Sequence, residues 1–261
     1  MGILNVTPDS FSDGGRFLNH DAAVAHAVQM VADGADILDV GGESTRPGSD
    51  DIPPNEERDR VMPVIERLVK ELPDVAISID TRKRDVAAAA LESGAAIVND
   101  VSAGADPAMF DLVRDAGAGL ILMHMQGDPK TMQQAPYYDD VVGEVKEFLR
   151  ERMEAAIFAG IGADALCVDP GVGFGKNLEH NLALMANVAQ FVDLGAPVLV
   201  GPSRKAFIGM LLDLPVDERV EGTAGAVAWL AGQGAHIVRV HDVKEMARVI
   251  RVVDAIRQAG S

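Results

Sequence analysis

Gly34-Ala35-Asp36-Ile37-Leu38-Asp39 is one of five similar segments in this chain, and their shared order indicates the fold. In each segment a helix-like stretch ends in Gly-Ala, an apolar run of strand length follows, and a polar residue ends the run. The other four run from Gly94 to Asn99, Gly117 to His124, Gly162 to Asp169 and Gly234 to Arg239. Gly closes a helix at little cost, and runs this uniformly apolar do not suit a strand with one wet face. We therefore predict buried parallel strands, whose carboxyl ends are where α/β enzymes place their chemistry.

Eight segments of the chain have the character of such strands. They are Gly2 to Val6, Asp36 to Gly41, Val75 to Asp80, Ala96 to Asn99, Gly119 to His124, Ala165 to Asp169, Pro197 to Gly201 and His236 to Val240. Helix-period segments separate them; Val61, Val64, Ile65 and Leu68, for example, follow the i, i+3, i+4, i+7 spacing. The chain therefore consists of eight β-then-α units.

The loops that leave the predicted strands are long, whereas those that enter them are short. The long loops are Thr7 to His20, Gly42 to Pro54, Met125 to Pro136, Pro170 to Glu179 and Pro202 to Val220. This asymmetry predicts an α/β fold of the (β/α)8 TIM-barrel type, with its site at the carboxyl-end face. A doubly wound open sheet is the alternative, because periodicity alone does not show closure. No linker divides the chain, so we predict a single domain over residues 1–261.

Composition excludes several classes of protein. The 261 residues are 48% hydrophobic, but no apolar stretch is long enough to span a bilayer and no secretory leader is evident, so we expect a soluble, cytoplasmic protein without a membrane partner. The net charge of -17 opposes binding to a phosphate backbone, so we expect no nucleic-acid partner. Cys167 is the only cysteine and lies in an apolar run, which indicates a buried structural thiol.

Polar residues at the predicted strand ends are the candidate functional set. They are Asn5, Asp80, Asn99, Asp169, Arg239 and His241. Side chains alternate along a strand, so Arg239 and His241 share a face that His236 does not share. By the same rule only one of Asn99 and Asp100 points inward. Against the acidic background, the cations near strand ends also stand out: Arg46, Arg82, Lys83, Arg204, Lys205 and Arg239.

The segment after Arg239 and His241 has the character of an anion site. Asp242 and Glu245 resemble a capping box, and the helix that begins there would direct its free N–H groups toward a phosphate. In the preceding unit, Lys205 can donate to a ring carbonyl or an anion.

Two predicted strand ends carry carboxylates, Asp80 and Asp169, which are costly to bury without a donor-rich partner. A ligand with adjacent N–H groups would satisfy them, and so would a salt bridge to Arg or Lys in the same mouth.

Several familiar motifs are absent from the sequence. Gly171 to Lys176 is one residue short of a P-loop, no zinc-binding histidine spacing occurs, and no nucleophile elbow is present. Gly171 to Gly175 instead suggests backbone that passes close to a flat ligand, with Phe174 as a lid.

At these positions the chain resembles the dihydropteroate synthases, the pterin-binding enzymes of folate biosynthesis that sulfonamides inhibit. The matching motifs run nearly end to end and follow successive predicted strands. They are Asn5-Val-Thr-Pro-Asp-Ser-Phe-Ser-Asp-Gly-Gly15, Gly41-Gly-Glu-Ser-Thr-Arg-Pro-Gly48, Ser78-Ile-Asp-Thr81, Asn99-Asp-Val-Ser102, Asp169-Pro-Gly-Val-Gly-Phe-Gly175, Ser203-Arg-Lys-Ala-Phe207 and Arg239-Val-His241. Members of that family usually carry a further stretch before the first motif. We expect either that the start of this sequence is trimmed or that the floor of the barrel lacks its usual cover, which would affect stability more than activity.

The resemblance implies a transferase that condenses 6-hydroxymethyl-7,8-dihydropterin diphosphate with 4-aminobenzoate and releases diphosphate. It also implies Mg²⁺ as cofactor, with Asn5 near the metal, and a homodimer. We expect an SN1-like route without a covalent enzyme intermediate, because the sequence offers no activated nucleophile.

The resemblance also assigns roles to residues of this chain. The expected pterin contacts are Thr45, Asp80, Asn99, Asp169 and Lys205; the expected diphosphate contacts are Asn5, Arg239 and His241; the expected aminobenzoate contacts are Phe11, Pro47, Phe174, Ser203 and Lys205. Asp80, Lys205 and Arg46 are the expected catalytic residues. Arg46 lies in the second of two long loops that we expect to order over a ligand.

Two other functions fit parts of this pattern. A pterin-dependent methyltransferase on a similar barrel would share the pterin-holding Asp and Asn residues, but it has no need for a diphosphate pocket. Arg239, His241 and the first two loops argue against it. A non-catalytic pterin-binding protein would be expected to lack one of the motifs, and none is missing.

Overall fold

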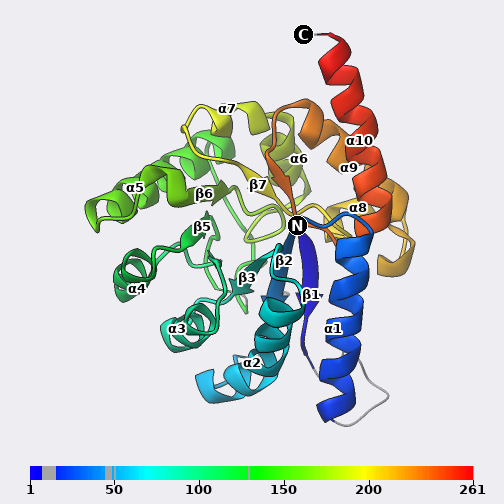
Figure 1. The fold of residues 1–261 in the computed structure, drawn as a ribbon. Coiled ribbons are helices and arrows are strands. Elements are labelled where there is room, and N and C mark those ends of the chain that lie inside the picture. The colour runs from blue at the N-terminus through cyan, green and yellow to red at the C-terminus, as the bar shows by residue number, and fades with distance from the viewer. Residues whose placement is uncertain (8–15, 45–48, 50, 129, 261) are drawn as a thin grey trace.

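Eight parallel strands form the centre of the molecule, and the helices surround them (Figure 1). The computed structural model describes residues 1–7, 16–44, 49, 51–128 and 130–260. The strands are β1 (Gly2–Asn5), β2 (Ile37–Gly41), β3 (Ala76–Asp80), β4 (Ile97–Asp100), β5 (Gly119–Met123), β6 (Leu166–Asp169), β7 (Leu199–Val200) and β8 (Ile237–Val238).

The strands close into a barrel, which decides between the two predicted architectures. β1 to β6 pair in sequence order, and β7 pairs with β8. Two parallel bridges complete the ring: Val168 pairs with Val198 next to β7, and Gly2 pairs with Val240 next to β8. The Ile3 amide donates to the Val240 carbonyl at 3.0 Å across the second junction. The predicted (β/α)8 barrel is therefore confirmed, and the open-sheet alternative is wrong.

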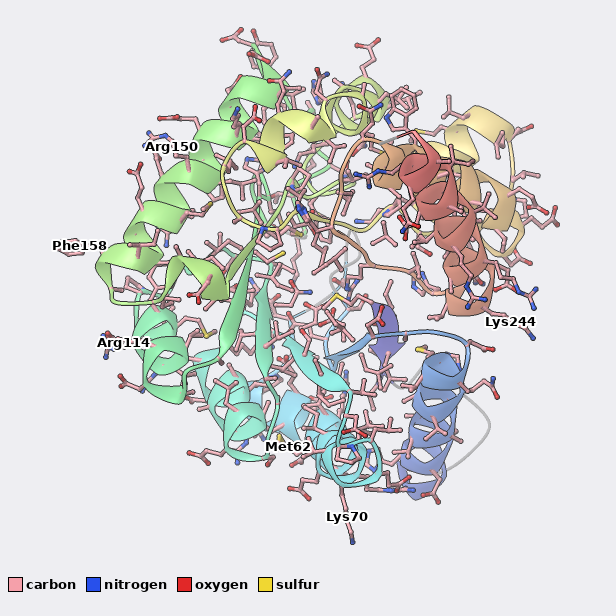
Figure 2. All side chains as sticks on the ribbon, turned by 45° about the horizontal axis from the view of Figure 1, so that its top comes forward. Met62, Lys70, Arg114, Arg150, Phe158 and Lys244 are labelled. Carbon is pink, nitrogen blue, oxygen red and sulfur yellow. The ribbon has the colours of Figure 1, made fainter. Side chains whose placement is uncertain are left out.

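The helices are α1 (Arg16–Ala32), α2 (Pro54–Glu71), α3 (Arg84–Glu92), α4 (Ala108–Ala116), α5 (Val141–Phe158), α6 (Leu178–Ala186), α7 (Val188–Val192), α8 (Ala206–Leu212), α9 (Val220–Gly232) and α10 (Val243–Ala259). Short 3-10 turns occupy Ala163–Ala165 and Val216–Glu218. Among the described residues, no helix is both long enough and apolar enough to cross a bilayer. The long side chains labelled in Figure 2, such as Lys70, Arg114, Arg150 and Lys244, extend outward from the ring of helices.

Two of the predicted strands are much shorter than expected. β7 and β8 have two residues each, whereas the sequence predicted Pro197 to Gly201 and His236 to Val240. The Val198 amide donates to Nδ1 of His236 at 3.0 Å, so a side chain replaces part of the backbone ladder. Pro197 has no N–H to donate, which also limits the ladder. His236, immediately before β8, is thus a structural residue.

Strand alternation separates two apolar layers. Outward residues such as Leu38, Val40 and Ile79 pack in the main core against the helices. A second cluster contains Ile121, Cys167 and Leu199, with Met1, Ile97 and Ile237 packed against it. Because its members come from six places around the ring and share the inward face, this cluster is the apolar plug of the barrel. Burial raises the pKa of the Cys167 thiol to about 12, which agrees with a structural thiol.

The same inward face turns polar toward the carboxyl ends of the strands. Three polar residues each follow a member of the plug by two positions. They are Asn99 after Ile97, Asp169 after Cys167 and Arg239 after Ile237. Asp39 and Asp80 share this parity on β2 and β3, because they pair with Ile3 and Asn99 in the parallel register. The fold therefore places a charged layer directly above an apolar one.

Gly171, just after β6, sits where no other residue fits. Its φ is +67°, and an added Cβ would lie 1.9 Å from the His124 carbonyl oxygen. We expect Gly171→Ala to lower the free energy of unfolding by roughly 3 kcal/mol, from left-handed strain plus overpacking. Gly117→Ala is the matched control, because Gly117 has a φ of +63° with nothing within 4 Å of the added Cβ. That variant should cost about 1 kcal/mol. Equal losses in denaturant titrations would show that the close approach to His124 is not limiting.

Candidate active site

Arg239 joins two carboxylates at the carboxyl-end mouth of the barrel. Its Nε donates to Asp39 Oδ2 at 2.6 Å, and its Nη2 donates to Asp80 Oδ2 at 2.6 Å. Asn99 Nδ2 also donates to Asp39 Oδ2, at 3.0 Å. Strands β2, β3, β4 and the end of β8 are thus connected by one network of charge-assisted hydrogen bonds. For Asp80 the structure shows the salt bridge that the sequence left as one of two possibilities.

The network leaves acceptor capacity unused. Asp39 is fully buried, and within the described residues no donor reaches Oδ1 of either Asp39 or Asp80. Buried polar atoms without a partner are uncommon, and at a mouth they are suited to a ligand with N–H groups. Burial raises the pKa of Asp80 to about 7. Arg239 opposes this rise, whereas the negative charge of Asp39 adds to it.

Asp169 and Lys205 lie on the other side of the mouth. Asp169 is buried, and its Oδ1 accepts a hydrogen bond from the Gly171 amide at 2.7 Å. Burial raises the pKa of Asp169, with Gly171 and Lys205 among the groups that oppose the rise. Lys205 Nζ donates to the Val172 carbonyl and lies 4.0 Å from the centroid of the Phe174 ring. Burial lowers the pKa of Lys205 to about 8, and Asp169 opposes this change.

Ser203 and His241 form a pair at the ends of β7 and β8. The Ser203 hydroxyl oxygen accepts from the His241 amide at 3.1 Å and lies 3.0 Å from His241 Nδ1. The hydroxyl has one proton and two lone pairs, so it can pair with Nδ1 in either tautomer of the ring. The pair thus connects the ends of β7 and β8.

The predicted capping box at the start of α10 is wrong. Asp242 is the N-cap residue, but its side chain makes no capping hydrogen bond. Its carboxylate instead pairs with Arg204, whose Nε donates to Asp242 Oδ2 at 2.9 Å and whose Nη2 donates to the other oxygen. A bidentate guanidinium competes more strongly for a carboxylate than the backbone amides do. Arg204 therefore ties the loop after β7 to the loop after β8.

Asn5 ends β1 beside Asp80. An added Cβ on Gly41 would lie 3.7 Å from both Asn5 Oδ1 and Asp80 Oδ2, so the two oxygens face the same small space. Within the described residues, no group of three or more His, Cys, Asp and Glu side chains is arranged to hold a metal. Mg²⁺ usually takes one or two protein oxygens plus phosphate and water oxygens, and the Asn5 amide oxygen fits that donor set.

Four predicted site residues lie outside the described part of the chain: Phe11, Thr45, Arg46 and Pro47. The base of the loop that holds the last three is anchored by ion pairs. Lys83 Nζ contacts Glu57 at 2.6 Å and also Glu43, and Arg82 lies 3.4 Å from Glu43. Arg82 and Lys83 therefore support the β2–α2 connection and do not belong to the Arg239 network.

The glycines after β6 approach protein rather than open space. An added Cβ on Gly175 would lie 2.5 Å from the Gln126 carbonyl oxygen, and one on Gly171 would lie 1.9 Å from the His124 carbonyl oxygen. That Gly171 to Gly175 also brings backbone near a flat ligand stays a prediction. The positive φ angles first allow this loop to pack on the β5–α5 loop, and Phe174 then reaches Lys205.

Sequence reasoning missed two residues that organise the mouth, Asp39 and Lys176. The sequence did contain a signal for Asp39. It lies two positions before Gly41, the last residue of its strand, and alternate residues of a strand share one face. Lys176 was considered only as part of a failed P-loop motif. Its buried contacts with the β5 end are not visible from sequence spacing.

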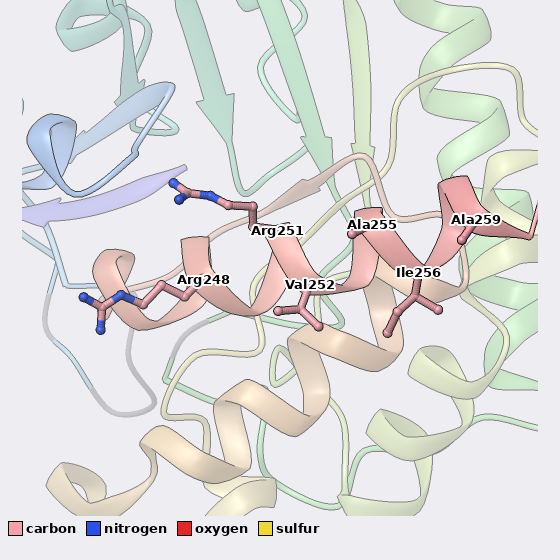
Figure 3. Close-up of a pocket in the computed structure, with 6 residues that line it drawn as sticks. All are labelled: Arg248, Arg251, Val252, Ala255, Ile256 and Ala259. Atoms are coloured by element: carbon pink, nitrogen blue, oxygen red, sulfur yellow. The ribbon is translucent and has the colours of Figure 1, made fainter.

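A hollow on α10 is remote from this network. It is lined by Arg248, Arg251, Val252, Ala255, Ile256 and Ala259 (Figure 3). Val252 and Ile256 are 60% and 68% exposed, and all six residues belong to one helix. It offers no carboxylate or titratable His, and therefore differs in chemistry from the barrel mouth.

Comparisons with known proteins agree with the geometry. Residues 1–241 match the family model described as pterin binding enzyme. The chain is 48% identical over 259 residues to dihydropteroate synthase of Escherichia coli (strain K12), covering 99% of this chain and 92% of that protein.

Solved structures show the same similarity. Yersinia pestis dihydropteroate synthase with a sulfonamide drug complex has a TM-score of 0.94 and 45% identity, covering 99% of this chain and 94% of that one. Xanthomonas albilineans dihydropteroate synthase in complex with 7,8-dihydropteroate has a TM-score of 0.90 and 44% identity, covering 98% and 92%.

The raised pKa of Asp80 has a testable consequence for stability. The unfolded chain releases this proton near pH 3.8, whereas the folded protein retains it up to about pH 7. Between these values the folded state binds more protons, so stability falls as pH rises. We expect the free energy of unfolding of the wild type, relative to Asp80→Asn, to decrease from pH 4.5 to pH 7.5. Asp254→Asn, at an exposed position on α10, is the matched control for loss of a carboxylate. A constant difference for Asp80→Asn would contradict the assignment.

Proposed function

The chain belongs to the dihydropteroate synthase family of pterin-binding enzymes, and we propose that its barrel mouth condenses 6-hydroxymethyl-7,8-dihydropterin diphosphate with 4-aminobenzoate. The products are 7,8-dihydropteroate and diphosphate. The observation that carries this proposal is the position of Arg239, which is held between two buried carboxylates at one mouth. Carboxylates that can bind the pterin ring and a guanidinium that can bind its diphosphate thus lie at the same mouth.

The acidic side of the mouth suits the pterin. Asp80 has an unused buried oxygen, and Asp169 has one oxygen beyond the one that accepts from Gly171. The aminopyrimidinone edge of a pterin presents adjacent N–H groups, and a carboxylate accepts two such donors side by side. Lys205 can donate to the ring carbonyl, and Asn99 adds an amide beside Asp39. Thr45 remains a proposed pterin contact on the basis of the motif alone.

The basic side suits the diphosphate. A guanidinium has five N–H donors, and the bonds from Arg239 to Asp39 and Asp80 use two of them. The remaining three can bind phosphate oxygens. In the tautomer in which Ser203 donates to Nδ1, His241 offers an Nε2–H donor to the phosphate. Asn5 would hold Mg²⁺, which when bound would neutralise charge on the departing diphosphate.

The reaction then needs no protein nucleophile. The bond between the pterin methylene carbon and the diphosphate oxygen breaks, and the electron pair leaves with the diphosphate. Arg239 and His241 stabilise that developing charge, while the pterin ring delocalises the positive charge on the methylene carbon. The amine of 4-aminobenzoate supplies its lone pair to form the new C–N bond and releases a proton. Cys167 is not available as an alternative nucleophile, since it is buried in the barrel plug.

The aminobenzoate would bind next to this carbon. Phe174 offers an aromatic face beside Lys205, and Ser203 lies at the end of β7. Phe11 and Pro47 stay proposed contacts. Arg46 stays a proposed catalytic residue, alongside Asp80 and Lys205. A methyltransferase without a diphosphate to release would have no use for the Arg239 and His241 pair.

We further propose that residues 1–261 act as a single domain in a cytoplasmic homodimer. The apolar pair Val252 and Ile256, four residues apart on α10 and flanked by Arg248 and Arg251, supports an interface with a second copy (Figure 3). Adjacent exposed apolar side chains on one helix face are typical of contact surfaces. The two arginines suit the surface of a partner with a net charge of -17.

The direct test supplies dihydropterin diphosphate, 4-aminobenzoate and Mg²⁺ and measures dihydropteroate. We expect product only when both substrates are present, and less of it without Mg²⁺. Arg239→Met should lower kcat/KM by about 10² to 10³, as expected for loss of a main stabiliser of developing charge. Arg150→Met, an exposed arginine on α5, is the matched control and should keep wild-type activity. Pterin binding without any dihydropteroate would instead support a non-catalytic binding protein.

A further inference from the structure

Lys176 is a buried cation that the proposed chemistry does not use. It is 2% exposed and follows the Gly171 to Gly175 loop. Its Nζ lies 2.9 Å from His124 Nδ1, 2.8 Å from the Phe174 carbonyl oxygen and 3.4 Å from the His124 carbonyl oxygen. Three ammonium protons thus have three acceptors, all of them uncharged. Among the described residues, no carboxylate lies within ion-pair distance of it.

Such an arrangement is costly, which indicates a role. An ammonium group buried without a paired carboxylate loses much of its solvation. Burial lowers the pKa of Lys176 to about 7; the nearby charge of Asp169 opposes this shift, and that of Lys205 adds to it. A methionine or leucine would fill the same volume without this cost. The hydrogen bonds to His124 and Phe174 are what Lys176 provides and an apolar side chain could not.

The acceptors of Lys176 connect two loops of the mouth. His124 follows β5, and its amide donates to the Asp169 carbonyl at 3.0 Å. Its ring is neutral, because burial and the adjacent Lys176 lower the pKa of His124 to about 3. The ring packs edge-on against Phe148 at 4.9 Å between centroids, which fixes the direction of Nδ1. From this fixed point, Lys176 reaches the Phe174 carbonyl in the loop after β6.

The loop segment that Lys176 holds is the one that contacts Lys205. The Val172 carbonyl accepts from Lys205 Nζ, and the Phe174 ring lies beneath that same ammonium group. Asn181 assists from α6 by accepting from the Gly173 amide at 2.6 Å. A connected path therefore runs from the His124 ring through Lys176 and residues 172–174 to Lys205.

We propose that Lys176 is a positioning residue for the second substrate. Its bonds to His124 and to the Phe174 carbonyl hold the Phe174 ring and Lys205 in the geometry that binds 4-aminobenzoate. This inference rests on the proposed function. Of the proposed pterin contacts, only Lys205 shares this dependence. Asp80, Asn99 and Asp169 are carried by strands β3, β4 and β6, so we expect the effect on the pterin to be smaller.

The test is Lys176→Met, which keeps a long unbranched side chain and removes the three donors. We expect KM for 4-aminobenzoate to rise about tenfold, the effect of roughly one hydrogen bond, while KM for dihydropterin diphosphate changes less than about twofold. Lys146→Met, on α5 with its Nζ 3.7 Å from Asp193, is the matched control and should leave both KM values unchanged. A purely structural role would lower thermal stability without separating the two KM values, and that result would overturn the proposal.

A second variant keeps the proposal testable if Lys176→Met fails to fold. His124→Phe retains a ring against Phe148 and removes the Nδ1 acceptor. We expect KM for 4-aminobenzoate to rise again relative to KM for dihydropterin diphosphate. The rise should be smaller than for Lys176→Met, because Lys176 keeps its two carbonyl acceptors. Equal changes for both substrates would overturn the proposal.

One further measurement does not depend on activity. Nuclear magnetic resonance of the His124 ring should show a neutral imidazole with its proton on Nε2 at pH 6. A protonated ring, or a proton on Nδ1, would refute the bond to Lys176. If the wild type shows the expected His124 tautomer but forms no dihydropteroate, the proposed function is refuted and the Lys176 geometry is not. An active wild type with unseparated KM values in both variants would refute the positioning role alone.

Discussion

The central constraint on this molecule is that one guanidinium must satisfy two buried carboxylates above an apolar plug. Asp39 is fully buried on β2, Asp80 on β3 is nearly so, and Arg239 forms an ion pair with both. Arg239 in turn has no other described ion-pair partner. The three groups fix one another across the barrel. The bond network also leaves one oxygen on each acid and three N–H groups on the base for a ligand.

The rest of the site follows from where the closed barrel places its strand ends. Alternation directs every second side chain inward, so the plug and the charged layer above it are built from the same strands. Asp169 and Lys205 repeat the combination of acid and base on the opposite side of the ring. Two further contacts connect the loops around the mouth. Arg204 and Asp242 join the loops after β7 and β8, and Lys176 and His124 join the loops after β5 and β6. Chemistry that separates a cationic pterin from an anionic diphosphate suits this mixed polarity.

Much of this arrangement could be predicted from the sequence, because strand parity and motif spacing are local properties. The positions of Asp80, Asn99, Asp169 and Arg239 at the strand ends followed from them, although parity left open which of Asn99 and Asp100 points inward. What failed depended on contacts between distant residues. The capping box at Asp242 was lost to Arg204, 38 positions away, and Asp39 became important only through Arg239, 200 positions away. Closure of the ring likewise rests on bridges from β1 and β6, which no periodicity reveals.

A double-mutant cycle between Asp39 and Arg239 tests the central constraint most directly. Asp39→Asn, Arg239→Met and the double variant would be compared by their dissociation constants for dihydropterin diphosphate. If Asp39 acts by holding Arg239, its substitution should matter little once Arg239 is gone, and the coupling should exceed about 1 kcal/mol. Effects that add within about 0.5 kcal/mol would show that the two residues act independently, which would contradict the account.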